Sequence, residues 1–293
     1  MTRRPHRWER GAGFPITDAD QLDAMVDARM PRVLFGEGDR PDAFDAPRVA
    51  IVGTRAATPM GIADAIEIGA FCARAGITVV SGLAIGIDGA AHTGALNAGG
   101  LTIGVVATGL DVTYPRRHER LYERVREQGL IVGENDYGTQ PLPWRFPIRN
   151  RIIAALADAV VVVEATTSGG ARITADDAVR FGRDVYALPG SRRNPAAAGC
   201  NQLLVDGAKP LLDPADVLFA LGRGGTVEGG WNGPSMPVDP HQMEVLLAFA
   251  GDPASIDQIE ARVQLSTNQL GAALRGLERA GHLERKRGMW WPR

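Results

Sequence analysis

The chain has 293 residues, which is enough for one large α/β domain and a small second domain. Hydrophobic residues make up 45% of it and charged residues 23%, a balance that excludes a wholly disordered chain. Because the formal net charge is −2, any surface for nucleic acid has to be a local feature.

Targeting and redox signals are weak. The two cysteines, Cys72 and Cys200, form no C-x-x-C pair, which argues against a zinc site or a disulfide framework. The basic N-terminus lacks an apolar h-region, and no apolar run is long enough for a transmembrane helix. We therefore expect a cytoplasmic protein that does not contact membranes and has no metal site and no cofactor.

Residues 1–45 form a short N-terminal segment that reads as irregular to weakly helical, with one amphipathic stretch around Ile16–Met30. From residue 46 to 221, short β-branched apolar runs alternate with helical stretches. The expected strands are 49–52, 77–80, 102–106, 130–132, 159–163 and 184–188, and the expected helices are 59–75, 86–98, 117–128, 149–157 and 174–182. This alternation predicts an α/β domain with a Rossmann-like, doubly wound, mostly parallel sheet.

Residues 222–240 are rich in glycine and proline and read as a linker. Residues 241–293 then predict a small winged-helix domain, with helices at 243–249, 255–262 and 266–280 and a hairpin at 282–291. Ser255 and Ser266 stand where N-caps belong. Because side chains alternate along a strand, Trp290 and Trp291 cannot both be buried.

Small residues follow several of the predicted strands. The carboxyl ends of parallel strands share one edge of the sheet. The small residues there leave backbone N–H groups exposed, and together with the helix dipoles these groups predict an anion site at that edge. The candidates are Gly53, Ser81, Gly82, Gly86, Ser168 and Gly169. The spacing spells neither a dinucleotide-binding fingerprint nor a P-loop.

Arginines and aromatic residues cluster in the same parts of the sequence. The candidates are Arg55, Arg116, Arg117, Arg145, Arg149 and Arg151, interleaved with Tyr114, Trp144 and Phe146. A basic strip with aromatic faces is typical of single-stranded DNA binding, since guanidinium groups follow phosphates while rings accept unstacked bases. The alternatives are internal salt bridges for Arg149 and Arg151, with Glu134 or Glu164, and plain solvation for Arg117.

Candidate catalytic groups are few, and no catalytic residue is expected. Asp88 and His92 are one helical turn apart, but no nucleophile or second histidine completes a set. A helix-packing pair is the favoured interpretation for these two residues. Glu134 and Glu164 could bind a ribose, although pairing with arginines is favoured.

Seven segments between about residues 48 and 220 carry a family pattern. They are 52–61 (VGTRAATPMG), 80–92 (VSGLAIGIDGAAH), 108–115 (TGLDVTYP), 146–154 (FPIRNRIIA), 163–165 (VEA), 173–175 (ITA) and 188–190 (LPG). In order and spacing they resemble the DNA-processing protein A (DprA/Smf) family. The loop at Ser168 departs from the family pattern at Gly170 and Arg172.

The resemblance implies an extended Rossmann-like fold that binds single-stranded DNA in a basic pocket, without catalysis. It also implies a homodimer that protects incoming strands during natural transformation and helps to load a RecA-type recombinase. The family's pocket residues correspond to Arg55, Arg116, Arg149 and Arg151, with Ser81, Gly82 and Gly86 beside them.

Two questions stay open at the level of the sequence. The stretch from Arg275 to Arg293 holds six basic and two acidic residues, which suits either DNA contact or protein docking by the winged helix. The large domain could instead be a nucleotide sensor coupled to the winged helix, or an enzyme like the nucleotide N-glycosidases. The latter carry a Pro-Gly-Gly-x-Gly-Thr loop that this chain lacks.

Overall fold

The computed structural model describes residues 6–9, 31, 33–223, 239–249, 254–286 and 288–292. They fall into two compact units, divided between residues 225 and 226. The predicted amphipathic stretch at 16–30 and most of the predicted linker lie outside the described residues. Within these ranges no helix is long and apolar enough to cross a membrane.

The first unit is built on a nine-stranded mixed sheet with the order β1-β2-β6-β5-β4-β3-β7-β8-β9. Seven strands run parallel: β3 (Arg48–Val52), β4 (Thr78–Ser81), β5 (Thr102–Val105), β6 (Leu130–Gly133), β7 (Ala159–Val162), β8 (Asp184–Ala187) and β9 (Lys209–Pro210). The six predicted strands are confirmed within one or two residues. The α/β fold with a mostly parallel sheet is confirmed with them.

The N-terminal segment is more ordered than its sequence predicted. β2 (Val33–Glu37) pairs antiparallel with β6, and β1 (His6–Glu9) pairs antiparallel with β2. The expectation of irregular structure is therefore wrong for these residues. A 3-10 helix, η2 (Pro41–Phe44), then leads into β3.

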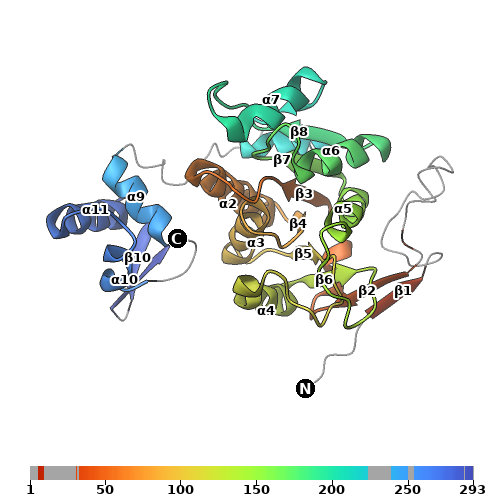
Figure 1. Ribbon diagram of the computed structural model, residues 1–293, viewed down its shortest axis with the longest axis horizontal. Helices are drawn as coiled ribbons and strands as arrows, with labels where there is room; N and C mark the ends of the chain where they lie inside the picture. The colour runs from red at the N-terminus through yellow and green to blue at the C-terminus, as the bar shows by residue number, and fades with distance from the viewer. Residues whose placement is uncertain are drawn as a thin grey trace. The chain divides into compact units, whose positions relative to one another are not determined.

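Helices cover both faces of the sheet (Figure 1). α2 (Pro59–Arg74), α3 (Ile87–Asn97) and α4 (Glu119–Gln128) lie on one face, and α5 (Arg145–Leu156) and α6 (Gly170–Arg180) lie on the other. Four short helices follow β8: η4 (Pro195–Ala197), α7 (Ala198–Val205), η5 (Pro214–Asp216) and α8 (Val217–Ala220). Since both faces are covered, every side chain of β3, β4, β5, β6 and β7 is buried.

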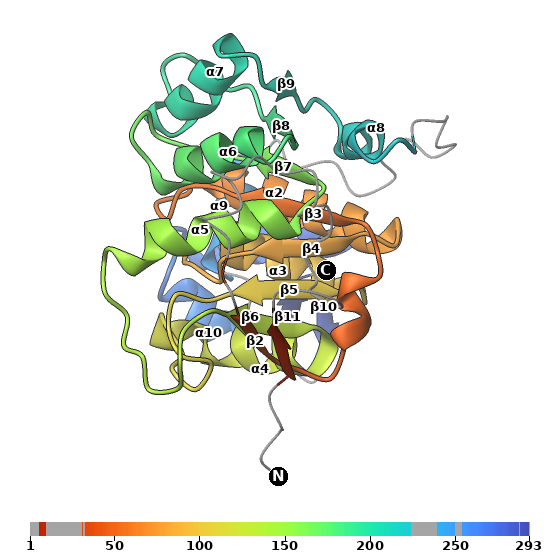
Figure 2. The same ribbon diagram turned by 90° about the vertical axis from the view of Figure 1, so that its right-hand side faces the viewer.

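α5 is the element that matters most for the candidate site. Figure 2 shows it lying across β3, β4 and β5, with its first residues near the edge where the strands end. The helix starts four residues earlier than predicted, because Pro147 falls in the first turn, where no intrahelical N–H bond is lost.

The second unit is a winged helix, as predicted. It contains α9 (Pro240–Ala248), α10 (Ile256–Glu260), α11 (Thr267–Arg279) and the antiparallel hairpin of β10 (Leu283–Lys286) and β11 (Met289–Pro292). Both predicted serine N-caps are confirmed, Ser255 and Ser266 each forming a capping box with the glutamine three residues on. Trp290 is buried in the core of the unit and Trp291 is 45% exposed, so the prediction for this pair is also confirmed.

Candidate nucleic-acid interface

Three strand-to-helix turns are tied together at the carboxyl edge of the sheet. Gly86, in the turn after β4, has a φ of +85°, and a Cβ there would collide with the carbonyl oxygen of Thr54 in the turn after β3. The Thr54 N–H donates to the carbonyl of Glu164, after β7, at 2.7 Å. Gly53 is equally confined, since a Cβ would lie 2.8 Å from that same carbonyl oxygen. These close backbone contacts hold the turns in fixed positions.

Arg55 is exposed at this edge and contacts an aromatic pair. Its Cζ lies 4.9 Å from the centre of the Phe146 ring, and the Phe146 and Tyr114 rings are 5.4 Å apart. The three residues come from the turn after β3, the first turn of α5 and the loop after β5. Tyr114 is 43% exposed. An exposed cation and two neighbouring rings thus meet from three separate segments.

A second cation–aromatic contact lies at the start of α5. The Arg145 Cζ is 4.6 Å from the ring centre of Trp144, which is 56% exposed. Arg145 also donates a 2.9 Å hydrogen bond to Oδ1 of Asn135, in the segment after β6. Asn135 therefore orients this arginine, a role that the sequence analysis missed.

Arg116 and Arg117 follow the cis peptide bond between Tyr114 and Pro115 and open a short 3-10 helix, η3 (Arg116–His118). Both are exposed, and neither side chain has an ion-pair or hydrogen-bond partner among the described residues. Nδ1 of His118 lies 3.0 Å from the carbonyl oxygen of Leu83, which links η3 to the turn after β4. We call one set of residues at this edge "the rim strip"; it consists of Arg55, Tyr114, Arg116, Arg117, Trp144, Arg145 and Phe146. Arg145 and Phe146 are half-buried, and the other five are exposed.

Arg149 does not belong to an exposed strip, which corrects the expectation for this residue. Its side chain is 4% exposed, and Nη1 donates to the carbonyl oxygens of Gly82, at 2.8 Å, and of Val105. Burial lowers the pKa of the guanidinium, and the nearby Asp88 carboxylate raises it. From inside the protein, the side chain ties α5 to the turn after β4 and to the last residue of β5.

Ser81 and Gly82 are also buried, so they are not accessible to a ligand. The Ser81 hydroxyl donates to the carbonyl oxygen of Ile51 at 2.6 Å. The Gly82 N–H donates to Oδ2 of Asp88 at 3.1 Å, so both polar groups of this glycine are used inside the protein. The prediction that these groups face an anion is wrong, because the interior of the domain already satisfies them.

The carboxylates after β6 and β7 have different partners. Glu134 pairs with Arg151 at 2.5 Å, which confirms the internal salt bridge for that arginine. Glu164 instead accepts hydrogen bonds from the N–H of Thr58, at 2.8 Å, and from its hydroxyl, at 2.5 Å. Pairing with an arginine is therefore wrong for Glu164, which anchors the N-cap of α2.

Ser168 and Gly169 lie at the start of α6, where Gly169 is the N-cap. Ser168 is exposed, and the Gly169 N–H donates to the carbonyl of Thr166 at 3.2 Å. The next residue, Gly170, accepts a 3.1 Å bond from the side chain of Asn150. This hydrogen bond attaches the loop that precedes α6 to α5.

Asp88 and His92 are buried within α3, as the packing interpretation expected. Nδ1 of His92 lies 2.6 Å from the hydroxyl of Thr102, on β5. Burial and the neighbouring His118 lower the pKa of His92 to about 3, so it is neutral at pH 7. Among the described residues no cluster of histidine, cysteine and carboxylate side chains could hold a metal ion.

Comparison with protein families identifies the chain. The model for DNA recombination-mediator protein A matches residues 18–222, and the model for the DprA winged helix domain matches residues 232–289. The chain belongs to the DNA recombination-mediator protein A (DprA) family. The resemblance drawn from the seven sequence segments is thereby confirmed.

Several curated relatives extend over most of the chain. Protein Smf of Synechocystis is 36% identical, over 90% of this chain and 75% of its own length. DNA processing protein DprA of Streptococcus pneumoniae is 44% identical, over 67% of this chain and 68% of its own length.

Two solved structures share the fold of the DprA family. The protein of S. pneumoniae has a TM-score of 0.62 at 37% identity and covers 73% of each chain. DNA processing protein A of Helicobacter pylori has a TM-score of 0.65 at 26% identity, over 75% of this chain and 97% of its own. The structural work on the H. pylori protein concerns its single-stranded DNA binding mode.

Proposed function

We propose that this DprA family member binds single-stranded DNA along the rim strip. The observation that carries the proposal is the contact of Arg55 with Phe146 and of Phe146 with Tyr114. Guanidinium groups neutralise phosphates, and exposed aromatic faces stack on unpaired bases, each stacked base contributing about 1–3 kcal/mol. The H. pylori relative, whose structural description names single-stranded DNA binding, supports the same ligand here.

A single strand suits this surface better than a duplex. Stacking on Tyr114, Trp144 or Phe146 requires a base whose face is free, and bases in a duplex are already stacked on one another. Arg116 and Arg117, which have no acidic partner among the described residues, would follow the sugar–phosphate backbone.

Binding rather than catalysis is proposed for this surface. Two carboxylates at the turns after β4 and β7, Asp88 and Glu164, accept hydrogen bonds from Gly82 and Thr58. They hold the turns in place and are not free to act as a base. Arg149 and Arg151 act through the same framework, as positioning residues behind the rim strip.

The protein's partners would be incoming single strands in natural transformation and a RecA-type recombinase, with the protein acting as a homodimer. The family description as a recombination mediator supports the recombinase. Support for self-association comes from large apolar side chains that are exposed on α7, on α8 and in the segment that joins them, at Val205, Phe219 and Leu212.

Fluorescence anisotropy with a labelled oligonucleotide tests the binding proposal. Arg55→Ala, and Arg116→Ala combined with Arg117→Ala, should each weaken binding about tenfold or more and reduce its salt dependence. Arg74→Ala is the matched control, because Arg74 is exposed at the far end of α2 and should leave affinity unchanged. Unchanged affinity in the rim variants would contradict the proposal and place the DNA path elsewhere. Saturable binding of a mononucleotide without oligonucleotide affinity would contradict it and favour a nucleotide sensor.

A further inference from the structure

α11 of the winged helix has two opposite faces. Leu270, Ala273, Leu274 and Leu277 are buried in the core of the unit. The opposite face is exposed and carries Asn268, Ala272, Arg275 and Arg279. The spacing of four, three and four residues places these side chains on one stripe of the helix.

The exposed stripe carries positive charge that the protein does not neutralise. Neither Arg275 nor Arg279 has an ion-pair partner among the described residues, and Nε of Arg279 donates only to the carbonyl oxygen of Arg275, at 3.3 Å. The nearest acids in sequence are Glu278, on the flank of the stripe, and Glu284, which pairs with Lys286 on the wing.

The wing adds a further cation. Arg285 is exposed on β10, and its Cζ lies 5.7 Å from the centre of the Trp290 ring, on the adjacent strand. Lys286, by contrast, pairs with Glu284 at 2.9 Å. Arg285 is thus the more available of these two wing cations.

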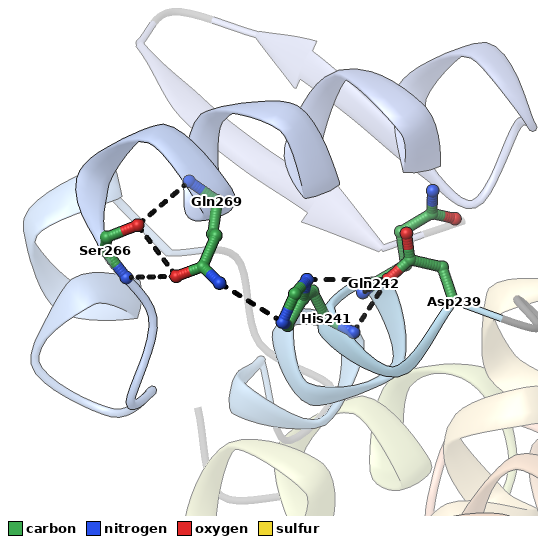
Figure 3. Close-up of polar contacts among 5 residues, drawn as sticks. All are labelled: Asp239, His241, Gln242, Ser266 and Gln269. Carbon is green, nitrogen blue, oxygen red and sulfur yellow. Dashed lines mark hydrogen bonds and ion pairs between the residues drawn. The ribbon is translucent and has the colours of Figure 1, made fainter.

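The start of α11 is fixed in place by a polar network (Figure 3). Ser266 and Gln269 form a reciprocal cap, and the Gln269 amide nitrogen lies 3.4 Å from Nε2 of His241, on α9. Asp239 in turn accepts bonds from the N–H groups of His241, at 2.8 Å, and Gln242, at 3.3 Å. The stripe is therefore presented on a helix whose first turn is anchored to its neighbour.

We propose that α11 inserts this stripe into the major groove of duplex DNA, as a second site separate from the rim strip. The second helix of a helix-turn-helix commonly occupies that groove. Arginine and asparagine side chains form paired hydrogen bonds with guanine and adenine edges, and a small residue such as Ala272 leaves room for a thymine methyl group. Arg285 contacts the phosphate backbone from the wing.

The composition of the stripe favours DNA over a protein partner. A protein-docking face places large apolar or aromatic side chains at its centre. The stripe has none: its four members are an amide, a methyl group and two guanidinium groups. The exposed large apolar side chains described in this unit, Ile256 and Trp291, lie on α10 and β11.

The test uses the full chain and a blunt-ended duplex without overhangs or loops, which offers no single-stranded segment. Arg275→Ala combined with Arg279→Ala should weaken duplex binding about tenfold or more, because both contacts with base edges are lost. The same variant should bind a single-stranded oligonucleotide as the unchanged protein does. Arg275→Lys with Arg279→Lys keeps the charge and should retain most of the affinity for random-sequence duplex.

Arg55→Ala serves as the reciprocal control, since it should lose single-strand affinity and keep duplex affinity. Absence of duplex binding by the unchanged protein, or equal duplex affinity in the Arg275/Arg279 alanine variant, overturns the inference. Neither result bears on the proposal that single-stranded DNA binds along the rim strip. That proposal is tested only by the measurements with a single-stranded oligonucleotide. Circular dichroism checks that the variants keep their helices.

Discussion

Nη1 of Arg149 lies 2.8 Å from the carbonyl oxygen of Gly82, and the N–H of the same glycine donates to Asp88. A buried cation and a buried acid therefore hold one peptide segment from both sides. Burial raises the pKa of Asp88, and the Arg149 charge opposes that rise. The turn after β4, which backs the rim strip, depends on both side chains remaining in place.

Replacing Arg149 should destabilise the protein, not merely weaken ligand binding. Arg149→Ala leaves Asp88 buried without its cation and frees two carbonyl oxygens, which should cost about 3–5 kcal/mol of unfolding free energy. Urea unfolding measures the change, with Arg74→Ala as a control of the same type on the surface. A loss below about 1 kcal/mol would show that the pair does not hold the turn.

Gly82 should tolerate no side chain. A Cβ there would lie 2.5 Å from Nη2 of Arg149 and 2.6 Å from Oδ2 of Asp88, so Gly82→Ala should cost about 1–3 kcal/mol through forced displacement of both groups. Gly170→Ala is the matched control, because the space around that position is open and it begins α6. The control should be neutral or stabilising by up to about 1 kcal/mol. Equal thermal stability of the two variants would refute the packing argument.

Asp64, on α2, makes the stability of the protein depend on pH. Burial, and secondarily the charge of Glu164, raise the pKa of Asp64 from 3.8 to about 6. The native state thus favours the protonated acid, and this contribution is complete below about pH 4 and is lost as the pH rises through about 6. Asp64→Asn mimics the protonated form and should stabilise the protein by about 1–2 kcal/mol above pH 7, the partial exposure of the site limiting the gain.

Urea unfolding at pH 4 and pH 7.5 checks this sign. The gain from Asp64→Asn should vanish at the lower pH, whereas Asp176→Asn, at an exposed position on α6, should have little effect at either. A gain of equal size at both pH values would mean that the carboxyl group of Asp64 is not the cause.

The cap of α11 should control the local stability of the winged helix. Ser266→Ala removes the hydroxyl that accepts from the Gln269 N–H and should cost about 0.5–2 kcal/mol. Hydrogen exchange of the first amides of α11 should accelerate, while the large unit is unaffected. Ser168→Ala, at an exposed serine that caps no helix, is the control. Unchanged exchange in the Ser266 variant would argue against the network drawn in Figure 3.

Much of the fold was predictable from the sequence because the central strands are buried on both faces. A strand that is buried on both faces has a continuous apolar sequence, as in Val49–Val52, and the structure confirms all six strands predicted from such runs. The antiparallel β1 and β2 escaped prediction, since β2 contains Gly36 and alternates in burial over only five residues. The start of α6 was placed too late because Gly170 reads as part of a loop.

The site was predictable only in part. Arg55, Tyr114 and Phe146 were singled out, and the structure brings them together. The burial of Arg149 was missed because arginine is rarely found in an interior. The signal was available in its position, which precedes the buried Ile152, Ile153 and Leu156 of α5 by three, four and seven residues.

Photo-crosslinking with a 5-iodouracil oligonucleotide tests the central claim most directly, because it reports where the bases lie. If single-stranded DNA follows the rim strip, peptides containing Tyr114, Trp144 or Phe146 should carry the cross-link, and Arg55→Ala should reduce its yield about tenfold or more at subsaturating protein. Cross-links confined to the winged helix, for instance at the exposed Trp291, would contradict the assignment of the strand to the edge of the large sheet.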